Sequence, residues 1–343
     1  MKKVLIYLIT FIVIIFIIPI ILTNNKNRNQ DEETSTQIKL PEEKYVQINT
    51  GEKEKIPEST NNTLKTIKLL KNETKEIVEM NLNEYLYRVL SAEMPATFEM
   101  EALRAQAIVA RTYTIYKANG HKHENAEVCD SYNCCQAYIE KEDRLEKWDK
   151  DVRQYNWDKI VYAVNSTQDN IITYEGNPIA AFFHSNSGGT TEIPLNVWGG
   201  IGYPYLQAVA TIGEEGYSQY SSSITLSKDE LMQKLKTKYP DIQIDFGNLE
   251  DIKILEYTEG NRVKTVKFGN KNISGVETRT LLGLKSANFQ IKKEAEKYVI
   301  YVLGYGHGVG MSQTGADSLA KQGYNALEII HHFYTDVVVE NIK

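Results

Sequence analysis

Residues 82–117 read LNEYLYRVLSAEMPATFEMEALRAQAIVARTYTIYK, and this stretch decides the fold. In its first part, apolar residues recur at helical spacing on a stripe made of Leu82, Leu86, Val89 and Leu90. The same stripe, continued by one turn, reaches Glu93, so a carboxylate stands where an apolar residue is expected. Because Pro95 disfavours helical geometry at Met94, the sequence predicts a helix that stops there and leaves Glu93 at its lip.

A second helix is predicted to begin near Thr97, which is a suitable N-cap. Glu99 and Glu101 follow in its first turn, where negative charge suits the helix dipole. Gln106 has apolar helical neighbours and needs a partner from elsewhere, and Arg111 follows before Thr112-Tyr113.

Two interpretations of Glu93 are open from spacing alone. It could be a solvated or ion-paired residue at a helix end. Alternatively, desolvation could raise the pKa of its carboxyl group, and a protonated acid at the edge of a cleft can protonate the leaving oxygen of a glycosidic bond.

Residues 4–22 form an uninterrupted apolar run after Lys2 and Lys3, close to the roughly 20 residues that a helix needs to cross a bilayer. They are predicted to be a transmembrane anchor that leaves the rest of the chain outside the cytoplasm. A cleaved secretory signal is the alternative, because Pro19 could shorten the spanning helix. Residues 23–62 are rich in Asn, Lys, Glu, Gln and Thr, which predicts a disordered tether.

The charge balance gives no sign of a nucleic-acid partner. The chain has 39 basic and 45 acidic residues, a net charge of −6, and no basic stripe. Residues 63–343 are long enough to form one large domain or two lobes with a substantial core.

All three cysteines lie in one short segment together with two histidines. His123, Cys129, Cys134 and Cys135 could supply a structural zinc site, although their spacing is not that of a standard finger. Outside the cytoplasm, a disulfide with one thiol left over is the alternative. A catalytic thiol is less favoured, since no base and orienting group stand in a defined arrangement around it.

A polar loop is predicted after a hairpin of residues 171–174 and 179–183 that turns at Glu175-Gly176-Asn177. The loop reads HSNSGGT over residues 184–190. It lacks the Gly-x-Ser-x-Gly elbow of a serine hydrolase, so its side chains are interpreted as substrate-positioning groups, or else as a turn with local bonds.

Residues 225–298 differ in texture and predict a second lobe, with a helix capped by Ser227 and strands at 252–257 and 263–268. A strand at residues 298–303 then leads into GYGHGVGMSQ, residues 304–313, and Ser312 is expected to open a final helix that continues through Tyr324. The alternating glycines do not match a dinucleotide fingerprint and instead permit close backbone approach beside His307.

Several motifs of this chain stand in one order: AEMP (92–95), AQA (105–107) with ARTY (110–113), HSNSGGT (184–190), VWGG (197–200) and GHGVGMSQ (306–313). Together they resemble the stage II sporulation protein D family over about residues 75–340, and the related amidase-enhancer proteins of vegetative cell-wall lysis. One departure is that clostridial members place a histidine beside a cysteine where this chain has Cys134-Cys135.

The resemblance implies a membrane-anchored lytic transglycosylase that cuts peptidoglycan glycan strands during engulfment of the forespore, in the septal intermembrane space. It implies partners too: an amidase that strips stem peptides first, and other membrane sporulation proteins. Glu93 matches the family's catalytic glutamate, and no cofactor beyond a structural zinc is needed. The residues expected to hold the sugar are Gln106, Arg111, His184, Ser185, Asn186, Ser187, His307, Ser312 and Gln313.

The sequence therefore predicts an α+β fold: a two-lobed domain of mixed helix and strand with a central substrate cleft, preceded by one transmembrane helix. A lytic transglycosylase needs only one carboxyl group, whereas hydrolysis would require a second acid to hold water, for which Glu192 is the candidate. A hydrolytic muramidase and a non-catalytic, glycan-binding enhancer of an amidase are the alternatives.

Deleting residues 1–25 is expected to give a soluble, folded protein, because the predicted tether separates the apolar run from the folded part. Size-exclusion chromatography and circular dichroism of the truncated chain check this expectation. Aggregation of the truncated protein would contradict the proposed boundary.

Overall fold

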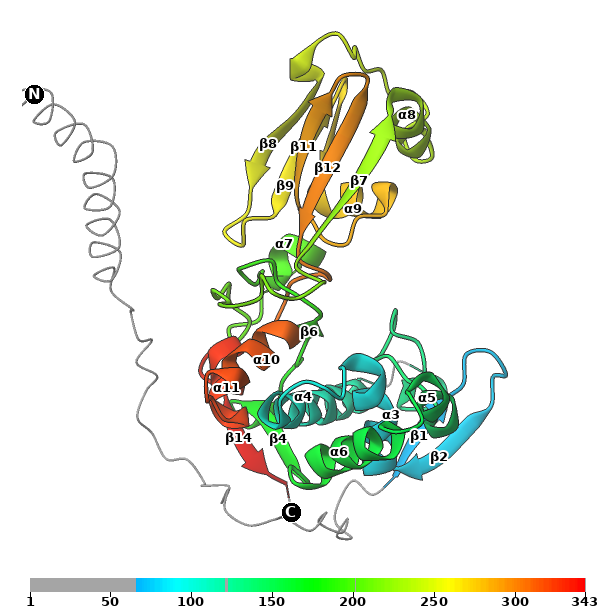
Figure 1. Cartoon of the computed structure of the whole chain (residues 1–343), viewed down its shortest axis with the longest axis vertical. Coiled ribbons are helices and arrows are strands. Elements are labelled where there is room, and N and C mark those ends of the chain that lie inside the picture. Colours follow the sequence, from blue (N-terminus) through cyan, green and yellow to red (C-terminus); the bar gives the residue numbers. More distant parts are fainter. Residues whose placement is uncertain (1–65, 121–122, 201, 343) are drawn as a thin grey trace, which may run out of the picture. The chain divides into compact units, whose positions relative to one another are not determined.

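The computed structural model describes residues 66–120, 123–200 and 202–342, which fold into a mixture of helices and strands (Figure 1). This confirms the predicted α+β class. None of the helices within those ranges is long and apolar enough to cross a membrane. The predicted anchor, residues 4–22, and the predicted tether, residues 23–62, lie outside the described residues.

The two helices predicted around Glu93 are α3, Leu82–Glu93, and α4, Met100–Asn119. The first helix ends where it was predicted to end. The predicted start of the second near Thr97 is wrong, because the intervening residues form a tight turn and Glu99 becomes the N-cap. The backbone N–H of Glu99 donates to Asp317 Oδ1 at 2.6 Å, so a residue distant in sequence helps to fix where α4 begins.

The first hydrophobic core is built around α4. Every residue from 102 to 115 is buried, as in a helix that is enclosed on all sides. The helices that pack against it are α3, α6 (Arg153–Asn165), α10 (Gln313–Lys321) and α11 (Ala326–Phe333).

Arg111 is buried in this core. Its Nη1 donates to Thr167 O at 2.7 Å and its Nη2 donates to Val164 O at 3.1 Å, at the C-terminal end of α6. A helix end leaves such carbonyls without intrahelical partners, so the Arg111 guanidinium binds them and holds the end of α6 against α4. These contacts give Arg111 a structural role, and none of them supports the sugar-binding role predicted for it.

Short strands pack beside the same helices: β1 (Thr66–Leu70), β2 (Ile77–Asn81) and β3 (Val128–Cys129); β4 (Asn170–Tyr174), β5 (Asn177–Pro178) and β14 (Val338–Asn341); β6 (Phe183–His184) and β13 (Met311–Ser312). The predicted turn after β4 is present, with Glu175 and Gly176 at positive φ. The predicted second strand of that hairpin, residues 179–183, is wrong. The strand that pairs with β4 is β5, which ends at Pro178, and β6 pairs in parallel with β13, which brings the polar loop to the start of α10.

A second hydrophobic core lies within residues 224–302. Its sheets have the strand orders β11-β12-β7 and β10-β9-β8, and helices α8 and α9 pack on their strands. The bounds are β7 Ser221–Ser227, α8 Lys228–Lys236, β8 Ile252–Tyr257, β9 Val263–Phe268, β10 Lys271–Ser274, α9 Gly275–Leu282, β11 Asn288–Glu294 and β12 Lys297–Leu303. The structure confirms the predicted strands β8 and β9 and the predicted cap of α8, where Ser227 and Glu230 form a capping box.

The chain enters and leaves the second core at adjacent points. β7 and β12 pair along their whole lengths, with Leu303 opposite Ser221, and the Gly304 N–H donates to Tyr220 O at 2.7 Å. Short elements complete the described chain: α5 (Lys141–Lys147), α7 (Pro194–Trp198) and the 3₁₀ helix Leu249–Asp251.

The glycine-rich segment after β12 runs against other backbone. A Cβ on Gly310 would lie 2.0 Å from Phe182 O, so only glycine fits there. Ser312 caps the following helix as predicted, but the helix does not continue through Tyr324. It ends at Lys321, and α11 begins after a turn in which Gly323 has positive φ.

Candidate active site

Glu93 is the last residue of α3, and two hydrogen bonds fix its half-buried carboxylate. Its Oε1 accepts the backbone N–H of Ala137 at 2.7 Å, and its Oε2 accepts Nε2 of Gln313 at 3.3 Å. Burial raises the pKa of Glu93, and the hydrogen bonds from Ala137 and Gln313 oppose that rise only in part. The carboxyl is therefore held in one place and biased towards its protonated form.

The polar loop and the glycine-rich segment, which ends at Gln313, lie side by side. Asn186 and Tyr305 exchange backbone hydrogen bonds of 3.0 and 2.8 Å. The Thr314 N–H donates to Ser185 O at 3.1 Å, and Ser185 itself is partly exposed. Two motifs that are separated by about 120 residues thus form one surface beside the glutamate.

His184 and His307 lie in ring contact, with centroids 5.7 Å apart. Burial, with a contribution from Arg262, lowers the pKa of His184 to about 3, and burial and the neighbouring His184 lower the pKa of His307 well below its ordinary value. His184 Nδ1 donates to Val309 O at 3.1 Å, while His307 Nδ1 accepts the Val309 N–H at 3.0 Å. Both rings are therefore neutral, and neither is suited to supply a proton at neutral pH.

Other residues of the predicted sugar-binding set are buried and engaged with protein groups. Asn186 Nδ2 donates to Thr314 Oγ1 at 2.8 Å, and Asn186 Oδ1 accepts the Gly188 N–H at 2.9 Å. The hydroxyls of Ser187 and Ser312 both donate to Glu214. Gln106 differs, since its Nε2 and Oε1 are fully buried and have no hydrogen-bond partner among the described residues.

Glu214 was not predicted, because nothing in its local sequence marks it. Its carboxylate is fully buried and accepts hydrogen bonds from three segments. The donors are Ser187 N (3.1 Å) and Oγ (2.5 Å), Gly189 N (3.2 Å), Thr211 Oγ1 (2.7 Å), Thr314 Oγ1 (3.0 Å) and Ser312 Oγ. Burial alone would raise the pKa of Glu214, but the hydrogen bonds from these donors outweigh it and lower the pKa.

Arg262, which directly precedes β9 of the second core, was missed for the same reason. Its buried guanidinium donates to Thr190 O at 2.8 Å and to Ser187 O at 3.0 Å. A Cβ on Gly308 would lie 2.1 Å from Arg262 Nη2, so this glycine admits the guanidinium. The second core thus binds the polar loop through hydrogen bonds from Arg262 to two carbonyl groups of the loop.

Glu192, the candidate second acid, is buried and bonded through both oxygens. Its Oε1 accepts the Ile193 N–H at 2.8 Å and Nδ2 of Asn196 at 2.8 Å, and its Oε2 accepts the Thr258 hydroxyl. A carboxylate with these contacts fixes α7 and is poorly placed to hold a water for attack on a sugar.

The predicted central cleft stays a prediction. A pocket of about 350 Å³ is lined by Asn196 and Val197 of α7 and by residues of the second core that include Val263, Glu277 and Leu281. None of the predicted catalytic or sugar-binding residues lines it.

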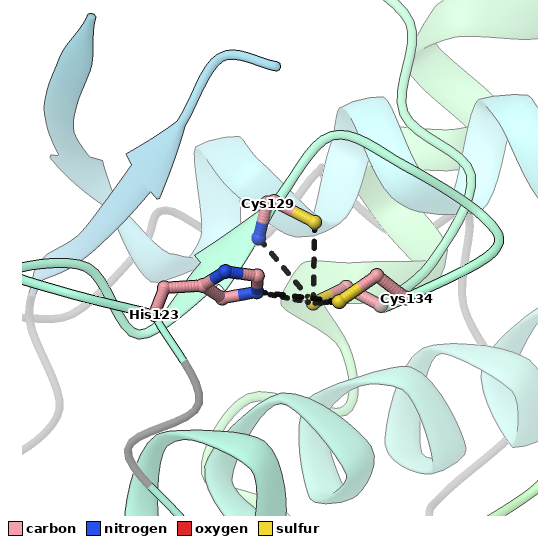
Figure 2. A group of neighbouring side chains, drawn as sticks. His123, Cys129 and Cys134 are labelled. Atoms are coloured by element: carbon pink, nitrogen blue, oxygen red, sulfur yellow. Dashed lines mark hydrogen bonds between the residues drawn. The ribbon is translucent and has the colours of Figure 1, made fainter. Parts of the chain in front are cut away.

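The predicted metal ligands come together as one group. The ligand atoms of His123, Cys129, Cys134 and Cys135 all lie within 4.8 Å of one another (Figure 2). His123 Nε2 lies 3.4 Å from the Cys134 and Cys135 sulfurs, and Cys135 Sγ lies 3.6 Å from Cys129 Sγ and 3.8 Å from Cys134 Sγ. Zinc–sulfur bonds of about 2.3 Å in a tetrahedron place sulfurs roughly 3.8 Å apart, whereas a disulfide needs about 2.05 Å. The cluster fits a metal ion and could hold one.

The metal cluster and the glutamate share a short piece of chain. Cys135 is followed by Gln136, whose Nε2 donates to Thr114 Oγ1 of α4 at 2.9 Å, and then by Ala137, whose N–H reaches Glu93. A metal bound at Cys135 would therefore fix the peptide that positions the carboxylate.

Comparison of the sequence with known proteins places this chain in a family. A family model described as Stage II sporulation protein covers residues 70–174. Stage II sporulation protein D of Bacillus subtilis (strain 168) is 31% identical over 337 residues, which is 97% of this chain and 94% of that protein. The chain belongs to the stage II sporulation protein D family.

Two further relatives support the same grouping. The stage II sporulation protein D of Bacillus amyloliquefaciens is 35% identical over 259 residues, 75% of this chain and 73% of that protein. An amidase enhancer of Bacillus subtilis (strain 168) is 29% identical over 298 residues, 72% of this chain but only 39% of that protein. The family resemblance inferred from the motifs is thereby confirmed.

Replacing Glu214 by glutamine is expected to lower the free energy of unfolding by about 2–4 kcal/mol, because an amide nitrogen would face donors in a buried site. Because folding lowers the pKa of Glu214, its contribution to stability is present above the unfolded pKa and is lost as the pH falls. Urea unfolding at several pH values measures both effects. Glu215→Gln is the control, since Glu215 is exposed, and equal stability of the two variants would refute this role.

The Cys/His cluster is expected to bind about one zinc per chain and to raise the melting temperature when it is loaded. Elemental analysis gives the stoichiometry, and melts with and without a chelator give the stability gain. Cys129→Ser should reduce both. Protein that holds no metal but contains a bond between two of the cysteines would show that the disulfide alternative is right.

Proposed function

We propose that this protein is a lytic transglycosylase that cleaves peptidoglycan glycan strands between MurNAc and GlcNAc and leaves 1,6-anhydro-MurNAc ends. The observation that carries the proposal is the Glu93 carboxyl, whose pKa is raised by burial and whose position is fixed by Ala137 and Gln313. The relatives named for sporulation and for amidase enhancement support a setting in the bacterial cell wall.

The reaction needs one group that gives and then takes a proton. Protonated Glu93 would donate to the glycosidic oxygen, which leaves as the GlcNAc 4-hydroxyl as its bond to MurNAc C1 breaks. The resulting carboxylate would take the proton of the MurNAc 6-hydroxyl while that oxygen bonds to C1, so the glutamate is regenerated and no water is consumed. Acid–base help of this kind contributes roughly 10²- to 10⁴-fold, so substrate positioning must supply the rest.

The surroundings of Glu93 favour this reaction over hydrolysis. The two histidines of the site are neutral, and Glu192 is buried with both oxygens bonded to protein groups. Hydrolysis with inversion or retention would call for a second available carboxylate close to the bond that breaks. Bound zinc would serve to hold the Ala137 peptide in place and has no step in the reaction.

The sugar would be held by the surface that the polar loop and the glycine-rich segment form. Gln313 contacts Glu93 directly, and Ser185 is partly exposed beside it. Three further side chains would act indirectly, by fixing the backbone of these loops: Asn186, Ser187 and Ser312. Gln106 of α4, whose buried amide group has no hydrogen-bond partner among the described residues, would contribute to the same sugar-binding region.

The proposal includes a place of action. A single-pass anchor at residues 4–22 would keep the catalytic part outside the cell membrane, in the septal space between mother cell and forespore. There it would cut glycan strands from which a partner amidase has removed stem peptides, alongside other membrane proteins of sporulation. A non-catalytic role as an enhancer of that amidase is the second candidate, favoured by the relative that carries this name.

Replacing Glu93 by glutamine is expected to abolish release of anhydro-ended products while fold and glycan binding persist, because glutamine keeps the shape but cannot exchange a proton. Mass spectrometry of digested, peptide-free glycan strands measures the products, and thermal melts check the fold. Activity of the wild type should fall as the pH rises through the raised pKa of Glu93.

Glu99→Gln is the matched control, since Glu99 lies nearby but is exposed. It should cleave like the wild type. Anhydro-ended product at the wild-type rate from Glu93→Gln would refute the mechanism. Reducing ends instead of anhydro ends would indicate a hydrolase, and glycan binding without any cleavage by the wild type would favour the enhancer.

A further inference from the structure

Trp198 is the last residue of α7, belongs to the VWGG motif and has no part in the reaction proposed above. Its side chain is 51% exposed, which is unusual for so large an apolar group. It is nevertheless packed against other rings. Its centroid lies 4.8 Å from that of Phe182 and 5.1 Å from that of His307. The indole therefore packs against two rings while about half of the residue faces solvent.

The helix that carries Trp198 is fixed at its beginning. Glu192 accepts the Ile193 N–H and the Asn196 side chain, each at 2.8 Å, and its other oxygen accepts the Thr258 hydroxyl of the second core. A helix of five residues has little stability of its own, so these bonds are what hold it. Glu192 is thus a positioning residue for the indole.

Two glycines follow Trp198. Gly199 and Gly200 have φ of 70° and 81°, a conformation that glycine adopts without strain. A Cβ built on either glycine would meet no atom within 4 Å. An aromatic side chain that packs against two rings and is about half exposed offers apolar surface on which another flat group can pack.

We propose that Trp198 is the platform of a sugar subsite, on which a pyranose ring of the glycan strand stacks. The C–H face of a pyranose is apolar and matches an indole in size, and the indole N–H can donate to a sugar hydroxyl. Ring contact with His307 joins this platform to the glycine-rich segment, whose last residue, Gln313, donates a hydrogen bond to Glu93. The choice of a glycan as the ligand rests on the proposed function, but stacking does not require cleavage.

Binding is best measured with variants in the Glu93→Gln background, so that the ligand stays intact. The probes are a soluble tetramer of N-acetylglucosamine and peptide-free glycan strands, titrated by calorimetry. Trp198→Ala should raise the Kd about tenfold, while Trp198→Phe, which keeps a flat ring, should stay within about threefold of the parent. Tyr155→Ala is the control, because Tyr155 is 71% exposed but lies on α6, and its Kd should not change.

Fluorescence gives a second measurement that does not depend on the alanine variant folding. The chain has three tryptophans, and only Trp198 has a largely exposed ring. Glycan should change the emission of the parent and of Tyr155→Ala, and Trp198→Phe should abolish that change.

Unaltered affinity in Trp198→Ala, or a change in emission that survives in Trp198→Phe, would overturn the subsite, including the case in which Trp198 serves a protein partner instead. A parent that binds no glycan would overturn it as well. Glycan binding that depends on Trp198, in a protein whose wild type releases no anhydro ends, would support the subsite and refute the proposed reaction.

Discussion

The site depends on one buried carboxylate, that of Glu214. Burying a charge costs several kcal/mol unless its hydrogen bonds are replaced, and here donors from the polar loop, Thr211 and the start of α10 replace them. Each donor must keep its position for the charge to stay satisfied. Segments that are far apart in the sequence are therefore fixed to one point, and Gln313 takes its place because it follows Ser312, which is bonded to Glu214.

Glu93 itself accepts hydrogen bonds from two segments that are fixed independently of each other. On one side, Gln313 extends from the segment that Glu214 fixes. On the other side, Ala137 extends from the loop in which the Cys/His cluster lies. The acid proposed for catalysis must be placed to within a fraction of an ångström, and hydrogen bonds from two separate segments restrict a side chain more than either would alone.

The parts of the fold that local patterns determine could be predicted from the sequence. The apolar stripe that ends at Glu93, the alternating strands β8 and β9, and the cap at Ser227 all depend on neighbouring residues. The Cys/His cluster was also predicted, since its ligands are rare residue types that lie close together in the chain.

The predictions that were wrong concern features of the fold that residues distant in the sequence determine. The start of α4 depends on Asp317, and the pairing of β6 depends on β13, neither of which a local pattern shows. The same holds for Glu214 and Arg262, because a buried polar residue looks like a surface residue until its partners are known. Short serine and asparagine side chains in the polar loop were assigned to substrate, whereas most of them bind other parts of the protein.

The second core begins and ends at one junction, where the Gly304 N–H donates to Tyr220 O. β7 and β12 are paired neighbours, and the hydrogen bond between Tyr220 and Gly304 lies at their ends. Residues 221–303 therefore begin and end at one place, as an inserted module does. A short turn could close that gap geometrically. It could not replace Arg262 and Thr258, which reach back to the polar loop and to Glu192. The module is therefore separable in its connectivity but not in its chemistry, and a minimal version of this protein would have to supply those two contacts by other means.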